Sequence, residues 1–235
     1  MLTLHRAAFL LPDPADPTAP SFADGAVVVR GELVEAVGPY PELAAAHPAA
    51  RVRDWGTAVL TPGLRNPWGQ RLLERDYHPD PREETGVEPV ADGLVGCTDE
   101  TRYGASARRG LQRMLGFGVT AVAGPFERAA VRTAVARSGV VALPEPSVVL
   151  EPLAVDPLAV LDPLTVLPLM RAVHGRMAAG GRADFAVFPV FPVSAGVGVA
   201  SASAAAAGPG AAGVEPASGG SLATVLGGRL VYRRR

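Results

Sequence analysis

The chain has 235 residues, 48% of them hydrophobic, so it can bury one large core or two smaller ones. Its 22 basic residues are all arginines, they are balanced by 23 acidic residues and they are scattered along the chain, which argues against a nucleic-acid-binding protein. The single cysteine, Cys97, excludes an internal disulfide and suits a reducing compartment, so we expect a cytoplasmic protein.

The apolar stretches do not suit export or a membrane span. The N-terminal MLTLHRAAFLLPDP has only a short apolar run before Pro12, too short for the core of a signal peptide. The longest charge-free stretch, SAGVGVASASAAAAGPGAAGV, lacks Leu, Ile and Phe and contains Gly and Pro throughout. We therefore expect no membrane partner and a flexible Ala/Gly/Ser loop over residues 194–220.

The first quarter of the chain has a strand pattern. Residues 2–4 begin an alternating strand, and the Pro/Asp-rich LLPDPADPTAPSFADG follows as a loop. Apolar runs at 26–30 and 33–37 flank Gly31, which can take a positive φ at a tight turn, so we predict a hairpin. The segment PYPELAAAHP predicts a short helix, and TAVL a strand that leads into TPGLRNPWGQ.

The middle of the chain changes character twice. Residues 71–102 are polar, have prolines at short intervals and show no sustained period, so we predict a long surface loop. From Ser106, the residues Leu111, Met114 and Leu115 share one helical face, and Gly116 or Gly118 ends the helix. Strand VTAVA, helix ERAAVRTAVARSG and strand VVALP follow, an alternation typical of an α/β layer.

The last third returns to strands. A helix is expected from about Leu164 to Ala179, with Asp162 capping it and Pro163 at its first position. GRADFAVFPV reads as a strand, and SLATVLGGRLVYRRR as two strands around Gly227-Gly228. The β-rich ends suggest a sandwich or small barrel assembled from both termini, with the α/β segment inserted between them.

These segments, in this order, resemble the amidohydrolase superfamily, in particular its imidazolonepropionase and aminodeoxyfutalosine-deaminase-like branch. GAVVVRGELVEAVGPYPEL is similar to the opening hairpin and helix of these enzymes, LTPGLRN to their passage into the catalytic barrel, and GLQRMLGFGVTAVAGPF to their first barrel helix and the following strand. GRADFAVFPV and LATVLGGRLVYRRR resemble their closing strands. The resemblance implies an α/β plus β fold: a composite β-sandwich-like domain from residues 1–62 and 182–235, with a (β/α) barrel segment inserted over 63–181.

That barrel segment is too short to be complete. Residues 63–181 amount to about half of the roughly 250 residues that a whole barrel needs, so only two or three strand-helix units fit. A truncated barrel remnant leaves strand edges and an apolar interior to be covered. We therefore expect an oligomer or an unusual compact α/β layer.

The resemblance also implies a metal site that this sequence lacks. In the family, the Pro-Gly-Leu segment continues into a His-x-His pair that, with two more histidines and an aspartate, binds zinc or iron and activates water. Those two positions fall on Trp68 and Gln70, which are poor or impossible metal ligands. We predict no catalytic residue, no metal and no cofactor. Asp162 is a possible relic of the family's aspartate, although a helix cap explains it equally.

The four histidines do not replace the missing ligands. His5 lies in the first strand, His47 at a helix end, His78 in the irregular segment and His174 in the late helix. None of the four follows a predicted barrel strand. A packing or surface role is expected for each.

Two further segments contain candidate functional residues: a possible replacement metal site and a possible cysteine nucleophile. RDYHPDPREE could form a replacement metal site, but a solvated connector is the better interpretation; its candidate ligands are Asp76, His78, Asp80, Glu83 and Glu84. Cys97 could act as a nucleophile near Asp99 or Glu100, yet without a partner histidine an unreactive cysteine is favoured.

Three functions remain open from the sequence. The first is a shortened relative without catalytic activity that has a structural, regulatory or small-ligand-binding role and pairs with itself or with an active homologue. The second is an active hydrolase of non-peptide C–N bonds in a cyclic amide, amidine or aminopurine-like substrate, with ligands from the His78 segment or a partner chain. The third is an unrelated binding module, favoured if the first and last segments do not share one sheet.

Overall fold

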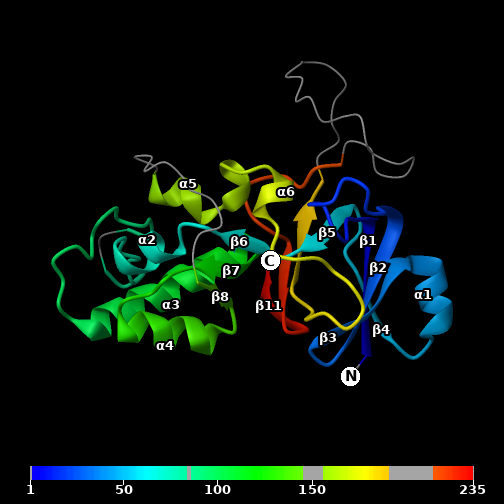
Figure 1. Ribbon diagram of the computed structural model, residues 1–235, viewed down its shortest axis with the longest axis horizontal. Coiled ribbons are helices and arrows are strands. Elements are labelled where there is room, and N and C mark those ends of the chain that lie inside the picture. The colour runs from blue at the N-terminus through cyan, green and yellow to red at the C-terminus, as the bar shows by residue number, and fades with distance from the viewer. Residues whose placement is uncertain (1, 84–85, 145–155, 191–213, 235) are drawn as a thin grey trace, which may run out of the picture.

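The structure is a computed structural model and describes residues 2–83, 86–144, 156–190 and 214–234. Figure 1 shows strands β1–β5 and helix α1 on one side, helices α2–α5 on the other, and the C-terminal strands between them. The mixed α/β class with a large sheet agrees with expectation. Within the described residues the two sheets do not close into a barrel.

The larger sheet contains strands from both ends of the chain, in the order β11-β10-β9-β5-β1-β2-β3, with β4 paired to β1. β9 runs antiparallel to β5, where Leu60 faces Val187, so the first and last segments share one sheet. The result that would have favoured an unrelated binding module is therefore not found. The strands are β1 (Leu2–Leu10), β2 (Phe22–Arg30), β3 (Leu33–Pro39), β4 (Arg51–Asp54), β5 (Ala58–Pro62), β9 (Phe185–Pro189), β10 (Ala223–Leu226) and β11 (Arg229–Arg233).

Both predicted hairpins are confirmed. β2 and β3 pair around Gly31, whose φ of 61° lies in the left-handed region that glycine enters without strain. β10 and β11 turn at Gly227 and Gly228, again with positive φ. The predicted helix follows the first hairpin as α1 (Tyr40–Ala46). β2 begins earlier than expected, and the largely exposed β4 was not predicted because its RVRD sequence has no apolar face.

The smaller sheet is parallel, with the order β6-β7-β8. Its strands are β6 (Leu64–Asn66), β7 (Val119–Ala123) and β8 (Val141–Leu143), and its helices are α2 (Gly69–Glu74), α3 (Glu100–Gly116) and α4 (Ala129–Ser138). Every residue of β7 is buried, as expected for the central strand of a covered parallel sheet. In Figure 1, α3 and α4 lie below this sheet. The predicted helix-strand-helix-strand alternation is confirmed.

The prediction of a long surface loop over residues 71–102 is wrong. The segment begins inside α2 and ends inside α3, and between them Tyr77, His78 and Leu94 are buried. Tyr77 and Val90 pair as an isolated bridge. The buried residues are spaced irregularly among prolines and carboxylates, so no period of 2 or 3.6 in the sequence predicts their burial.

The predicted helix over residues 164–179 is also wrong. The chain forms α5 (Pro157–Leu161), a single 3₁₀ turn at Pro163–Thr165 and the short α6 (Leu169–Ala172). Pro168 has no N–H to donate and limits any helix that precedes it. Beyond α6 the backbone is extended, and the His174 N–H donates to the Gly63 carbonyl at 2.7 Å. The extended residues Val173 and His174 therefore lie beside β6, where Val173 pairs with Leu64.

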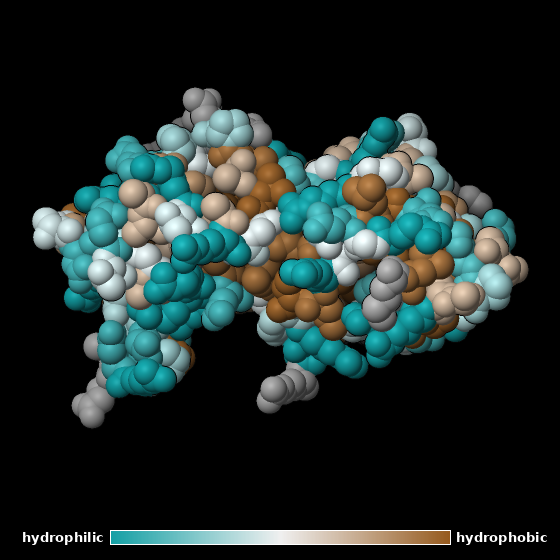
Figure 2. All heavy atoms as spheres, turned by 90° about the horizontal axis from the view of Figure 1, so that it is seen from below, coloured by the Kyte–Doolittle hydropathy of each residue, from teal (hydrophilic) through white to brown (hydrophobic). Residues whose placement is uncertain are grey.

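Apolar residues are exposed in places around the junction of the two sides. Figure 2, seen from below, shows hydrophobic residues gathered where the two halves meet. No helix among the described residues is both long and apolar enough to cross a membrane. Most of the predicted Ala/Gly/Ser loop, residues 194–213, lies outside the described residues.

Candidate functional site

The segment TPGLRNPWGQ leaves the large sheet and enters the small one. It runs from the end of β5 through β6 to the start of α2, where Trp68 is the N-cap residue and Gln70 lies in the first turn. The Trp68 side chain is half-buried and packs against the core around β7. A Cβ on Gly69 would lie 2.6 Å from the Ala123 carbonyl oxygen, so glycine lets α2 approach the end of β7. Packing therefore places Trp68 and Gly69 at the end of β7.

Asn66 fixes this segment, a role that the sequence analysis missed. Its side chain is fully buried, its Nδ2 donates to the Val160 carbonyl at 2.7 Å and its Oδ1 accepts from the Trp68 N–H at 2.9 Å. The amide therefore ties the end of β6 to α5 and starts α2. An Asn-Pro pair just before a helix is a turn signal that could have revealed the second contact.

Asp162 uses both carboxylate oxygens on backbone groups. Oδ1 accepts from the Leu164 N–H at 3.0 Å, and Oδ2 accepts from the Gly219 N–H at 2.7 Å. The predicted helix cap is present, although it caps a 3₁₀ turn instead of a long helix. Burial raises the pKa of Asp162, while the N–H groups of Gly219 and Leu164 oppose that shift. The carboxylate thereby joins the α5 layer to the loop that precedes β10.

The RDYHPDPREE residues are not brought together around one point. The Asp76 Oδ1 accepts from the Asp92 N–H at 2.9 Å, Asp80 faces Arg109 at 3.6 Å, and Glu83 accepts from the Tyr77 hydroxyl. Glu84 lies outside the described residues. Among the described residues there is no group of three or more His, Cys, Asp or Glu side chains that could hold a metal ion.

His78 is a fully buried histidine, not a residue of a solvated connector. Its backbone N–H donates to the Ser106 hydroxyl at 2.9 Å, and its Nε2 lies 2.8 Å from the Leu72 carbonyl, which makes Nε2 the protonated nitrogen. The Nδ1 atom is buried without a hydrogen-bond partner among the described residues. Burial lowers the pKa of His78 to about 4, so the ring is neutral at pH 7.

The tight packing around His78 depends on Gly110 of α3. A Cβ at Gly110 would lie 2.6 Å from His78 Nε2, closer than real contacts allow. The helix glycine therefore makes room for the imidazole. Beside it, Arg71 Nε and Asp76 Oδ2 face each other at 3.7 Å, an ion pair that compensates two buried polar atoms otherwise without hydrogen bonds.

The other histidines hold structural positions. His5 lies in β1, where its Nδ1 accepts from Trp55 Nε1 at 3.3 Å and its ring meets Phe185 edge-on with centroids 4.9 Å apart. Burial and the nearby Arg53 lower the pKa of His5 to about 3. His47 follows the last residue of α1, as expected, and His174 lies beyond α6 and not within a helix.

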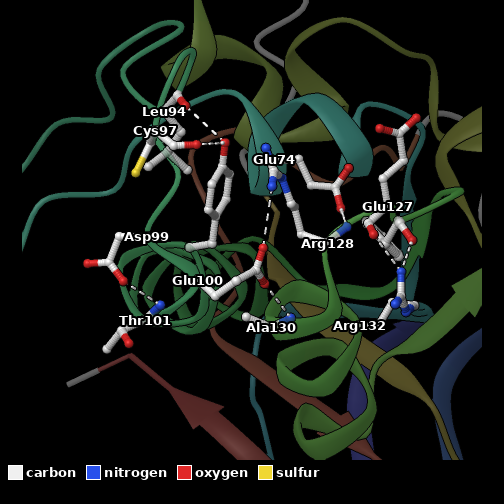
Figure 3. Close-up of polar contacts among 12 residues, drawn as sticks. Glu74, Leu94, Cys97, Asp99, Glu100, Thr101, Glu127, Arg128, Ala130 and Arg132 are labelled. Atoms are coloured by element: carbon white, nitrogen blue, oxygen red, sulfur yellow. Dashed lines mark hydrogen bonds and ion pairs between the residues drawn. The ribbon is translucent and has the colours of Figure 1, made fainter.

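Cys97 lies beside helix starts whose carboxylates are already engaged. Its hydrogen bonds run through the backbone, since its N–H donates to the Leu94 carbonyl and its own carbonyl accepts from the Tyr103 hydroxyl. Asp99 accepts from the Thr101 N–H at 2.8 Å and caps α3 (Figure 3). No histidine contacts the Cys97 sulfur among the described residues, so the arrangement does not resemble that of a catalytic nucleophile.

Helix α4 receives its N-terminal caps from two other helices. Glu74, at the end of α2, accepts from the Arg128 N–H at 2.7 Å, and Glu100, at the start of α3, accepts from the Ala130 N–H at 3.1 Å. The Glu100 carboxylate also faces the Arg128 guanidinium at 3.4 Å (Figure 3). These buried and half-exposed carboxylates therefore serve helix capping, a long-range role that local sequence does not reveal.

Comparisons with known proteins agree with the N-terminal hairpin and helix. The family model for the bacterial imidazolonepropionase-like composite domain matches residues 25–50, which span most of β2, β3 and α1. No curated protein matches the chain.

Several solved structures resemble part of the chain. They include Aspergillus niger ochratoxinase (20% identity, TM-score 0.42, 60% of this chain and 29% of that chain) and guanine deaminase from Bradyrhizobium japonicum (18%, 0.43, 60% and 34%). Helicobacter pylori aminofutalosine deaminase is similar at 16% identity and a TM-score of 0.41, over 60% of this chain and 32% of that one. The chain spans about a third of the length of these structures. The family-model match supports the resemblance to the imidazolonepropionase-like composite domain over residues 25–50.

Proposed function

We propose that this chain is a shortened, non-catalytic relative of the imidazolonepropionase-like amidohydrolases. In this proposal, residues 1–62 and 182–235 form the composite β domain, and residues 63–181 are a truncated barrel remnant whose parallel strands are β6, β7 and β8. The observation that supports it is the identity of Trp68 and Gln70 at the two positions where the resemblance places the family's His-x-His pair, together with the packing of Trp68 against the core.

The residues near these positions do not fit a zinc or iron ion. An indole has no lone pair for a metal, and a glutamine amide is a weak ligand for either ion. Asp162, the possible relic, has one backbone N–H bound to each carboxylate oxygen. A metal would have to displace the contacts that hold the 3₁₀ turn and the Gly219 segment. In this proposal, no step of the chain's function depends on a metal.

Metal analysis of the purified full chain tests the proposal. Cells are grown with added zinc and iron, and the protein is assayed on cyclic amide, amidine and aminopurine-like compounds before and after treatment with a chelator. We expect far less than one divalent ion per chain and no hydrolysis above buffer. One bound ion per chain, lost together with hydrolase activity on chelation, overturns the proposal.

A second candidate function keeps the family's C–N hydrolysis, with ligands from the His78 segment or from a partner chain. One observation favours it: the His78 Nδ1 lone pair is buried and has no partner among the described residues. Replacing His78 with Gln, which can still donate to the Leu72 carbonyl, together with Asp80→Asn, tests the first version. Unchanged activity removes it, and a solution mass equal to one chain removes the second.

The same proposal includes location and partners. A single cysteine fits a reducing cytoplasm. A shortened relative that has no catalytic activity can still bind a second copy of itself or an active homologue. Exposed apolar side chains on the α5–α6 layer, Leu158, Val166 and Met170, support a partner there. Light scattering of the purified chain, alone and mixed with a full-length family member, measures both associations.

A further inference from the structure

A cavity of about 500 Å³ lies between the C-terminal half of α3 and the end of β11. This α3–β11 cavity is bordered by the Pro79–Pro81 turn and by the glycine pair that precedes β10. Its volume falls in the range of small-molecule sites. The lining residues are Pro79, Pro81, Arg109, Gln112, Arg113, Gly116, Phe117, Gly219, Gly220, Tyr232 and Arg234.

The charged lining residues are all arginines, although Asp80, between the lining Pro79 and Pro81, faces Arg109 Nη1 at 3.6 Å and offsets part of the positive charge. Three arginines from two distant parts of the chain face the cavity, and no carboxylate lines it among the described residues. Two of the three are held in place: Arg109 Nε donates to the His78 carbonyl at 2.7 Å, and Arg234 Nη2 donates to the Gly219 carbonyl at 2.7 Å. Since a guanidinium has five N–H donors, both retain donors for another group.

Arg113 is the member of this set whose charge lacks compensation. It is half-buried, and none of its N–H groups has a hydrogen-bond or ion-pair partner among the described residues. Burial and the charge of Arg109 lower the pKa of Arg113, while Glu88 opposes that shift. Although Asp80 faces Arg109, Arg113 has no such carboxylate, and a partly desolvated cation beside another is unfavourable; an anion that accepts from both offsets that cost.

The remaining walls suit a flat apolar group. Phe117 and Tyr232 contribute aromatic rings, and a Cβ on Gly116 would lie 3.5 Å from the Tyr232 ring, so that ring lies directly over the end of α3. Gln112 adds an exposed amide on the same helix. Aromatic walls with convergent cationic donors are the usual composition of a site for a planar anionic molecule.

We propose that the α3–β11 cavity binds a small organic oxyanion, a planar apolar molecule with a phosphate or carboxylate group whose oxygens accept from Arg113 and Arg109. The cavity lies beside the start of β7, whereas Trp68 and Gly69 lie at its other end, about 13 Å away at the usual strand rise. Binding in this cavity therefore does not depend on whether the chain hydrolyses a substrate.

Calorimetric titration of the full chain with phenyl phosphate, benzoate and inorganic phosphate tests the proposal. We expect binding of one molecule of phenyl phosphate or benzoate per chain at submillimolar to millimolar concentration. The aryl compound should bind more tightly than inorganic phosphate because its ring contacts Phe117 and Tyr232. Which aryl compound binds more tightly tells whether the natural group is a phosphate or a carboxylate. Absence of binding by all three at millimolar concentration overturns the proposal.

Arg113→Gln and its matched control Arg108→Gln locate the site. Both remove one arginine from α3, but Arg108 is exposed and outside the lining. Arg113→Gln should weaken binding of the aryl compound about tenfold or more, and Arg108→Gln should leave it nearly unchanged. Equal weakening by both variants shows a diffuse charge effect and contradicts the assignment.

If Arg113→Gln does not fold, a measurement on the protein without substitutions tests the same site. Arginine side chains are modified with phenylglyoxal, and the modified positions are identified by mass spectrometry. With phenyl phosphate present, modification of Arg113 and Arg109 should slow, while modification of Arg108 should not. Protection of none of these arginines contradicts the proposal.

Discussion

Both carboxylate oxygens of Asp162 accept hydrogen bonds from backbone N–H groups. Its oxygens satisfy the N–H groups of Leu164 and Gly219, which belong to segments far apart in sequence. Asp162→Ala leaves both donors unsatisfied in a site where the residue is 3% exposed. We expect a loss of about 2 kcal/mol or more in the free energy of unfolding, measured by urea denaturation.

A matched control for Asp162 is present six residues earlier. Asp156 also precedes a proline and caps a helix, accepting from the Leu158 N–H at 2.9 Å, but it is exposed and makes this contact within its own segment. Asp156→Ala should cost about 1 kcal/mol or less. Equal losses for both variants would mean that the Gly219 contact adds nothing.

The buried His5 makes the stability of the large sheet depend on pH. Its folded-state pKa of about 3 lies below the 6.5 of the unfolded chain, so the stabilisation is complete above pH 6.5 and is lost as the pH falls towards 3. His78 acts in the same direction down to about pH 4. The free energy of unfolding should decline below pH 6.5 by about 1.4 kcal/mol per pH unit for each histidine.

Replacing His5 with Leu separates this effect from the protonation of carboxylates. The variant keeps an apolar group in the core and has no imidazole to protonate, so its stability should fall less steeply between pH 6.5 and 4. Chemical denaturation at several pH values measures both slopes. Identical slopes would show that His5 is not a neutral, desolvated group in the folded protein.

At the residue scale, local motifs support predictions and long-range contacts do not. The assignment of Trp68 and Gln70 to the family's His-x-His positions rests on their spacing from the Pro-Gly-Leu segment and stays a prediction. The roles of Asn66, His78 and Glu74 depend on contacts with residues 6 to 94 positions away, and no local pattern encodes such contacts. Burial of His78 was missed because its neighbours are prolines and carboxylates.

Helix α4 depends on carboxylates from α2 and α3 at its N-terminus. Its own N-cap residue, Arg128, provides no side-chain cap. Glu74→Ala removes the acceptor for the Arg128 N–H inside the protein, and we expect a loss of about 1–2 kcal/mol with lower amide protection in the first turn of α4. Hydrogen exchange measures that protection.

Glu127→Ala is the control for the capping prediction. Glu127 is exposed, lies beside Arg128, and its described hydrogen bond uses the backbone carbonyl, which the substitution keeps. Its stability and exchange should match those of the original protein. If Glu74→Ala also left α4 protection unchanged, the cap from α2 would not stabilise the helix.

At the element scale, turns and strictly periodic segments could be predicted and proline-rich segments could not. The glycines at Gly31 and Gly227-Gly228 predicted the two hairpin turns, because few other residues adopt those positive φ values. The helix expected from Leu164 failed because a proline at position 168 and the pairing of Val173 with Leu64 favour an extended chain. Apolar spacing alone cannot distinguish these outcomes.

The whole molecule depends on its last strands. β10 pairs with β9, and β9 pairs with β5, so the C-terminal hairpin completes one half of the large sheet. A chain ending at Ser221 loses the buried Ala223 and Val225 and leaves β9 unpaired on one side. We expect no cooperative thermal transition for this truncation, by circular dichroism. A chain ending at Arg234 is the control and should unfold cooperatively; equal behaviour of both would contradict the prediction.

The pairing of β5 with β9 means that β5 is synthesised long before its partner strand. Every residue of β5 is buried in the finished sheet, yet its antiparallel partner is made more than a hundred residues later. At ribosomal speeds of about 5–20 residues per second, roughly 6–25 s pass with this apolar edge open. Until β9 is made, the chain therefore exposes a strand edge that can pair with the same strand of a neighbouring nascent chain, and we expect chaperones that cover this edge to raise its yield in cells.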